Sequence, residues 1–197
     1  MARNTWHDGD AIWSGENPFI KLRNTPDGGD LTRASFFRVV WSPVGEGHAL
    51  FIVSDLDGEG NDDLAAIYTD SIELGNWLKS EIMQNPFWTE RDLPIAEAKF
   101  SFHGDSRQSR TEVIESADGR IELTWADLAK PAAFCIEAET DPEFHLLSLI
   151  IPAGRVEVAV NGRKAAGTPF DNEMCGKNVS SCCLSFSETW IRLDRKT

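Results

Sequence analysis

Positive charge, cysteine and long apolar runs are all scarce in this chain. Its 19 Lys and Arg residues stand against 32 Asp and Glu residues, which gives a formal net charge of −13. A surface of that sign repels nucleic-acid backbones and anionic lipid, so we expect neither nucleic acid nor a membrane as a partner. The longest apolar run, residues 146–152, includes a serine and is too short to cross a bilayer.

The first ten residues contain no apolar segment of the kind that directs secretion. The four cysteines, Cys135, Cys175, Cys182 and Cys183, form no C-x-x-C pair. We therefore expect a cytoplasmic protein whose cysteines are reduced and fill space in the core, because free cysteine behaves as a small apolar residue. A disulfide between Cys175 and Cys182, or a reactive thiol, is the alternative interpretation.

Several catalytic motifs are also missing. The sequence has no G-x-S-x-G nucleophile motif, no Walker phosphate loop, no G-x-G-x-x-G after a predicted strand and no H-E-x-x-H. Standard serine hydrolysis and nucleotide-dependent chemistry therefore have no support, and no nucleotide cofactor is expected.

The patterns that are present predict a mainly β protein in a single domain, residues 1–197. Short β-rich runs separated by turn residues are typical of antiparallel hairpins. The predicted strands are residues 35–42, 49–54, 64–69, 95–103, 110–117, 120–125, 133–139, 143–151, 155–160, 163–167 and 180–193. Residues 1–30 are rich in Gly, Pro, Asn and Asp and are expected to form an irregular N-terminal arm.

One segment has helical rather than β periodicity. Apolar side chains recur on one face of residues 70–84, at Leu74, Trp77, Leu78 and Ile82. Asp70, with Glu73 three residues later, resembles a capping box and predicts the start of this helix. We expect the helix to cover part of a single antiparallel β-barrel of lipocalin-like shape, or of a sandwich.

Two dipeptides, Asp118-Gly119 and Asn161-Gly162, predict two-residue hairpin turns, because both favour the positive φ angles of type I′ turns. A turn at Asp118-Gly119 places Glu115 directly opposite Glu122 on the next strand. Two facing carboxylates either lie in solvent near arginines or share a proton or a metal ion at a site.

The sharpest local signal is an acidic loop within residues 51–70. Oxygen-bearing side chains occur at alternate positions of this loop, at Asp55, Asp57, Glu59, Asn61 and Asp63. Calcium takes six to eight oxygen ligands, which alternating carboxylates and the Asn61 carbonyl would supply. A solvated acidic turn is the alternative interpretation, because Asp and Gly are common turn formers.

Residues 55–64 read D-L-D-G-E-G-N-D-D-L. This segment resembles the D-x-D-G-D-G-x-x-D-L calcium loop of FG-GAP and VCBS repeats and departs from it at Glu59. The resemblance implies that the loop binds calcium. It covers residues 51–70 in a single copy, so neither the propeller fold nor the adhesion role of those families is expected.

No two histidines have the spacing of a local metal site. The histidines are therefore considered one by one as candidates for acid–base chemistry. His103 shares a predicted strand face with Lys99 and Ser101, and exposure near a strand end is its alternative role. His145 lies on a strand that is apolar on both faces, and a core or rim position is its alternative role. The candidate catalytic residues are His103, His145, Glu115 and Glu122.

Four tryptophans offer flat apolar walls for a ligand, namely Trp41, Trp88, Trp125 and Trp190. The first functional hypothesis is therefore a β-barrel that binds a small apolar or aromatic molecule. One alternative is an enzyme (a lyase, isomerase or hydrolase) that uses His and Glu acid–base chemistry in the barrel. The other is a non-catalytic interaction module stabilised by calcium. A homo-oligomer is compatible with each of them.

Overall fold

The computed structural model describes residues 9–136, 144–174 and 176–193 and confirms a mainly β protein. The strands are β1 (Gly9–Glu16), β2 (Phe19–Leu22), β3 (Thr32–Trp41), β4 (Gly47–Ser54), β5 (Leu64–Thr69), β6 (Ile95–Asp105), β7 (Ser109–Ser116), β8 (Gly119–Leu128), β9 (Ala132–Ile136), β10 (Phe144–Val160), β11 (Arg163–Lys164), β12 (Asp171–Met174), β13 (Lys177–Ser180) and β14 (Cys183–Leu193). The helical segments are α1 (Ile72–Trp77), the π-helical turn η1 (Leu78–Ile82) and α2 (Pro86–Thr89).

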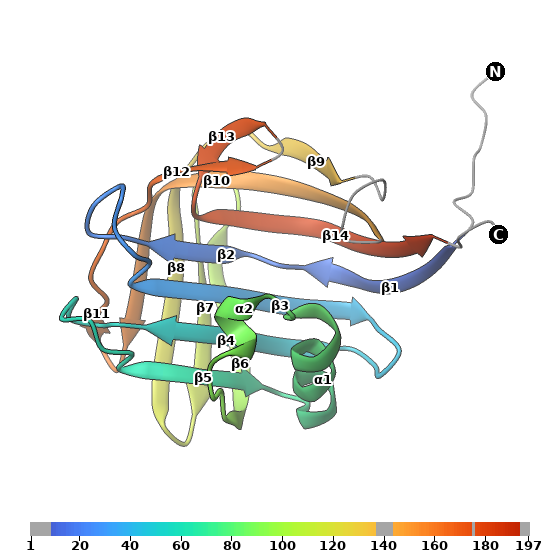
Figure 1. Ribbon diagram of the computed structural model, residues 1–197, viewed down its shortest axis with the longest axis horizontal. Coiled ribbons are helices and arrows are strands. Elements are labelled where there is room, and N and C mark those ends of the chain that lie inside the picture. Colours follow the sequence, from blue (N-terminus) through green and yellow to red (C-terminus); the bar gives the residue numbers. More distant parts are fainter. Residues whose placement is uncertain (1–8, 137–143, 175, 194–197) are drawn as a thin grey trace.

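Nine strands pair into a closed ring in the order β14-β2-β3-β4-β5-β6-β7-β8-β10, and β10 returns to β14. In Figure 1, β2 to β5 cross the front of the molecule, and β6 to β8 run behind them. The pairing of β5 with β6 is parallel, unlike the other pairings of the described strands, and the helical segments connect these two strands. A closed ring of this kind fits a barrel-like or sandwich arrangement.

Side chains fill the inside of the ring. Alternate residues of each strand face inward, as in β3, where Phe36 belongs to the inner core and Phe37 to an outer one. The largest inner side chains include Trp125, Phe36, Ile20, Leu50 and Ile52, each fully buried. The interior is therefore a packed core.

The outer core lies between β3–β5 and the helical segments (Figure 1). Leu74 and Leu78 are fully buried there, as the apolar periodicity predicts. The helix begins one residue later than expected, because Ser71 accepts the capping bond from the Leu74 amide while Asp70 bonds to His48 instead. The helix also changes to a π-helical turn at Leu78, and the sequence did not predict α2.

No helix of the described chain is long and apolar enough to span a membrane.

Two local predictions are wrong. Residues 9–22 do not form an irregular arm: β1 pairs with β14 and β3, and β2 pairs with β3. The first hairpin turns at Ala117-Asp118, one residue earlier than expected, so Glu115 faces Arg120 and not Glu122. The predicted turn at Asn161-Gly162 is confirmed by the pairing of Val160 with Arg163 and by φ angles of 51° and 80°.

Candidate functional sites

A groove of about 660 Å³ lies on the outer face of the ring. We call it the outer groove. Its floor is formed by β2, β3, β10 and β14, and its sides by the segment around α2 and by the β12–β13 hairpin. Figure 1 shows β2 and β14 between these two sides. The helical segments cover the outer faces of β3 to β5 and leave part of the outer faces of β2 and β14 uncovered.

Two of the predicted ligand-binding tryptophans line this groove. Trp88 comes from α2 and Trp190 from the end of β14. The Trp190 ring stacks on Phe144, with 4.2 Å between centroids, and the Trp88 ring contacts Phe51 edge to face at 6.0 Å. Packing of this kind holds both indoles in place. The remaining apolar lining includes Met83, Phe134, Leu146 and Ile150.

Three buried polar side chains form a chain of hydrogen bonds in the floor. The hydroxyl oxygens of Ser148 and Ser185 are 2.7 Å apart, and Ser185 donates to the Glu188 carboxylate at 2.9 Å. Trp190 Nε1 donates to the other carboxylate oxygen at 2.8 Å. Burial raises the pKa of Glu188, against the opposing effect of hydrogen bonds from Trp190, Ser185 and Asn17.

A β-bulge places Glu188 in the groove. Leu147 pairs with Thr189 and Leu149 with Phe186, so Ser148 alone stands opposite two residues of β14. The first of these two, Ser187, has a φ of +54°. Strict alternation from Ser185 would direct Glu188 into the ring. The extra residue restores it to the groove face, and bulges often re-aim side chains next to functional sites.

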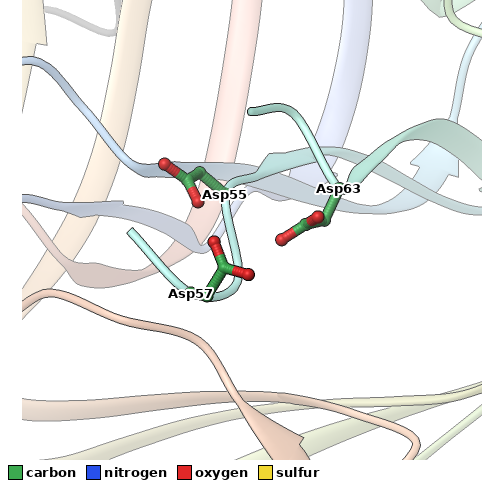
Figure 2. A group of neighbouring side chains, drawn as sticks. All are labelled: Asp55, Asp57 and Asp63. Carbon is green, nitrogen blue, oxygen red and sulfur yellow. The ribbon is translucent and has the colours of Figure 1, made fainter. Parts of the chain in front are cut away.

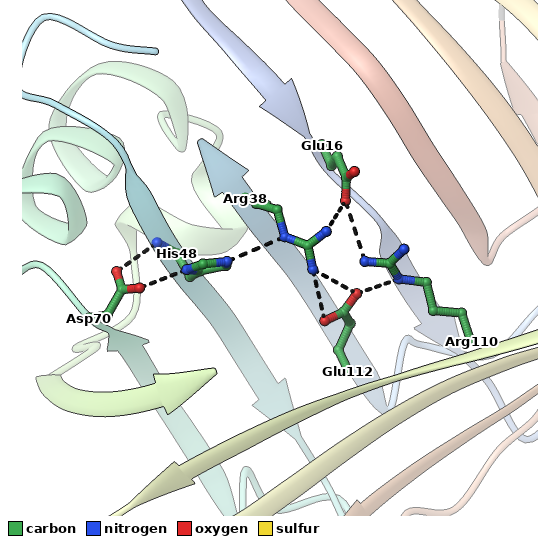
Figure 3. A network of polar contacts seen from close by, with 6 residues as sticks. All are labelled: Glu16, Arg38, His48, Asp70, Arg110 and Glu112. Carbon is green, nitrogen blue, oxygen red and sulfur yellow. Dashed lines mark hydrogen bonds and ion pairs between the residues drawn. The ribbon is translucent and has the colours of Figure 1, made fainter. Parts of the chain in front are cut away.

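A second polar cluster closes one end of the ring. We call it the ring-end network, and it consists of Glu16, Arg38, His48, Asp70, Arg110 and Glu112 (Figure 3). Arg38 donates to Glu16 at 2.9 Å and, more weakly, to both Glu112 oxygens at 3.4 Å. Arg110 Nε donates to Glu112 at 2.6 Å. Burial raises the pKa of Glu112, although the charge of Arg110 opposes the effect.

His48 links this network to the start of the helical segment. Arg38 Nε donates to His48 Nε2 at 3.3 Å, so the ring proton is on Nδ1, which donates to Asp70 at 2.6 Å. The imidazole stacks on Phe100, with 5.2 Å between centroids. A recess of about 380 Å³ is lined by His48 and Arg38 together with Phe100, Ser101, Phe102 and Glu112. A histidine oriented by a carboxylate beside a recess is suited to acid–base chemistry.

The acidic loop brings three of its five predicted calcium ligands together (Figure 2). Asp55, Asp57 and Asp63 each offer a carboxylate oxygen, and these oxygens lie within 4.8 Å of one another. Asp55 is buried and accepts hydrogen bonds from the amides of Gly58, Glu59 and Gly60. Calcium binding by the loop stays a prediction, because these bonds also suit a loop without a metal ion.

The remaining two predicted ligands are outside that cluster. Glu59 and Asn61 are exposed, and the Asn61 carbonyl accepts the Asp63 amide at 3.0 Å. Arg163 donates to Asp57 at 2.9 Å. The amide of Glu59, followed by the Arg163 side chain, lowers the pKa of Asp57.

The four predicted catalytic residues lie on four different strands, and none of them lines the outer groove. His103 is exposed on β6, opposite Thr111, and His145 is half-buried on β10, opposite Ile191. Glu115 and Glu122 both pair with Arg120, at 2.9 and 3.0 Å. The arrangement matches the alternative in which nearby arginine screens these two carboxylates.

The other two predicted ligand-binding tryptophans lie away from the groove. Trp125 is fully buried inside the ring, where its Nε1 donates to the Phe19 carbonyl at 3.2 Å. Trp41 is 47% exposed at the end of β3.

Three cysteines lie in the described residues and form no disulfide. Cys182 and Cys183 are buried, as predicted, and burial raises the pKa of their thiols to about 11 and about 12. The prediction of a core position is wrong for Cys135, which is exposed on the short strand β9, and Cys175 lies outside the described residues.

Comparisons with known protein families, with curated proteins and with solved structures found no match to this chain.

Sequence reasoning missed the polar groups of both sites, namely Lys21, Ser148, Ser185 and Glu188 in the groove and Glu16, Arg38, His48, Asp70, Arg110 and Glu112 at the ring end. One signal was present for the groove. Glu188 is the only charged residue between Lys177 and Arg192. A single acid in a long, otherwise uncharged strand indicates a buried, functional or bulged position. The ring-end residues come from separate strands, and no local pattern connects them.

Proposed function

We propose that this protein is a β-barrel of lipocalin-like shape that binds a small apolar or aromatic molecule in the outer groove. The observation that carries the proposal is the combination of two fixed indole walls, from Trp88 and Trp190, with a buried polar floor in a groove of about 660 Å³. Small-molecule sites typically have this composition, with a mostly apolar lining and a few convergent polar groups. A volume of this size accommodates a molecule of several rings or a medium-length chain.

The proposed ligand site differs in position from the sequence-based expectation, which placed the ligand inside the barrel. The ring is filled by its inner core, so the ligand would rest against the outside of the ring, between α2 and the β12–β13 hairpin. A reducing, cytoplasmic setting belongs to the same proposal and is supported by the buried thiols of Cys182 and Cys183.

Fluorescence titration with the neutral aromatic probe N-phenyl-1-naphthylamine tests the proposal. Asn172→Trp fills the groove from the β12 side, whereas Asp171→Trp adds the same side chain at an exposed position that does not line the groove. We expect the wild type and Asp171→Trp to bind the probe, and Asn172→Trp to lose at least about tenfold in affinity, equivalent to about 1.4 kcal/mol. Equal binding by both variants, or no binding by the wild type, would contradict the proposal.

Acid–base catalysis at the ring-end network is a second candidate function. The observation that favours it is the 2.6 Å hydrogen bond that His48 Nδ1 donates to Asp70 beside the recess. In a screen of small esters, lactones and hydroxy acids, this function predicts turnover that His48→Gln abolishes and His103→Gln, an exposed control, preserves. Turnover that survives His48→Gln would rule it out.

A further inference from the structure

Lys21 brings an unpaired positive charge to the outer groove. It lies on β2 between Ile20 and Leu22, which both point into the inner core, so the Lys21 side chain projects toward the groove. Within the described residues, the Lys21 ammonium group forms no hydrogen bond and no ion pair. Burial, and then the charge of Arg33, lower the pKa of Lys21. A half-buried ammonium without a partner is costly, and an anionic ligand would compensate for it.

The neighbouring charges neutralise Lys21 only in part. The Asp30 carboxylate raises the pKa of Lys21, against the larger lowering effects of burial and of Arg33. Arg23 and Arg33 both pair with one carboxylate, that of Asp30. These three basic side chains and one acid leave an excess of positive charge at this end of the groove. The excess is local, because the chain as a whole carries a formal charge of −13.

Two acids also line the groove, and neither pairs with Lys21. Glu188 receives hydrogen bonds from Trp190 and Ser185, and its burial favours the protonated form. Glu173 lines the opposite side, on β12. The groove therefore has a cationic end at β2, apolar walls of tryptophan, and acids on its β14 and β12 sides.

We propose that the ligand is an organic acid, with its apolar body between Trp88 and Trp190 and its carboxylate or sulfonate on the ammonium group of Lys21. This inference rests on the proposed function and names the ligand class for the same groove. Charge-assisted hydrogen bonds are about twice as strong as neutral ones, and they gain further strength where water is partly excluded.

Three probes of one shape and different charge test the inference: naphthalene-2-acetate, the neutral naphthalene-2-acetamide and the cationic 2-(2-naphthyl)ethylamine. Isothermal titration calorimetry at neutral pH and low salt should give an affinity for the acetate at least about tenfold above that for the amide, and weakest binding for the amine. Lys21→Met should remove the preference for the acetate over the amide, so that the two probes bind with similar affinity. Lys21→Arg should retain the preference, which shows that the charge is responsible.

Lys164→Met provides the matched control, because Lys164 is exposed, pairs with Glu157 and does not line the groove. It should leave the affinities for all three probes unchanged. Circular dichroism of each variant confirms that it is folded. Equal affinity for acetate and amide, or an acetate preference that survives Lys21→Met, would overturn the inference while the proposed function stands. Failure of all three probes to bind would overturn both.

Discussion

The indole of Trp190 donates a 2.8 Å hydrogen bond to the carboxylate of Glu188, two residues earlier on β14. This bond holds the Trp190 ring, which forms a wall of the outer groove, and the Glu188 carboxylate in its floor in a fixed relative position. The hydroxyl of Ser185 holds the second oxygen of that carboxylate at 2.9 Å. The acid is therefore oriented before any ligand arrives, which reduces the entropy cost of recognition.

Glu188→Gln should alter the pH dependence of stability. Because burial raises the pKa of Glu188, the folded protein retains a proton that the unfolded chain releases above about pH 4.5. The wild type therefore loses stability as the pH rises from that value through the raised pKa. Glu188→Gln removes this loss, so its stability relative to the wild type should increase with pH. Urea unfolding at several pH values measures the difference, and parallel curves for the two proteins would refute the assignment.

Glu112→Ala should destabilise the protein strongly. Glu112 is 1% exposed and is a shared partner of Arg38 and Arg110, so its removal leaves both guanidinium groups to share the single carboxylate of Glu16. The expected cost is about 3–5 kcal/mol. Glu115→Ala, on the same strand but exposed, should cost a small fraction of that. Chemical denaturation measures the free energy of unfolding of the two variants. Similar decreases for both would show that the buried ring-end network stabilises the protein no more than an exposed ion pair does.

Asp55→Ala should destabilise the acidic loop even in the presence of a chelator. The buried Asp55 carboxylate accepts three amide hydrogen bonds. Without it the amides of Gly58 and Gly60 lose their acceptor, and the Glu59 amide keeps only its 3.1 Å bond to Asp57. The expected loss is about 1–3 kcal/mol. Glu59→Ala, at an exposed position of the same loop, is the control and should have little effect. If Asp55→Ala were as stable as the wild type, solvent would be replacing these hydrogen bonds.

Calcium should raise the melting temperature of the wild type if the loop is a metal site, and Asp57→Asn combined with Asp63→Asn should abolish that rise. Asp62→Asn changes an exposed acid outside the three-residue cluster and should leave the rise intact. Differential scanning calorimetry of each protein, with calcium and with a chelator, measures this change in melting temperature. The absence of any calcium effect in the wild type would leave the loop as an acidic turn.

The local patterns predicted much of the fold. The apolar stripe that includes Leu74 and Leu78 identified a helix that packs on a sheet, and Asn161-Gly162 identified a hairpin correctly. Short β-rich runs between turn residues identified most strands, because β-branched and aromatic side chains pack well on a sheet. The strands β1 and β2 were missed, because their turn-forming Gly, Pro, Asn and Asp residues favour loops until distant partners pair with them.

The candidate sites could not be predicted in the same way. Glu188 reaches the groove only through the bulge at Ser187, and a bulge shifts a side chain to the opposite face without a reliable local signature. Lys21 looks like an ordinary solvated residue until β12 and α2 are folded beside it. At the ring end, Arg38 and Glu112 are separated by 74 residues and meet through the sheet topology alone.

The pairing of β14 with β1, β2 and β10 has a consequence during synthesis. The two N-terminal strands emerge from the ribosome long before residues 183–193, with a delay on the order of ten seconds at ordinary translation rates. Throughout that interval the edges of β1 and β2 that pair with β14 lack this partner and can associate with other chains. The ring can therefore close only after β14 has left the ribosome, so its closure is a late, post-translational step of folding.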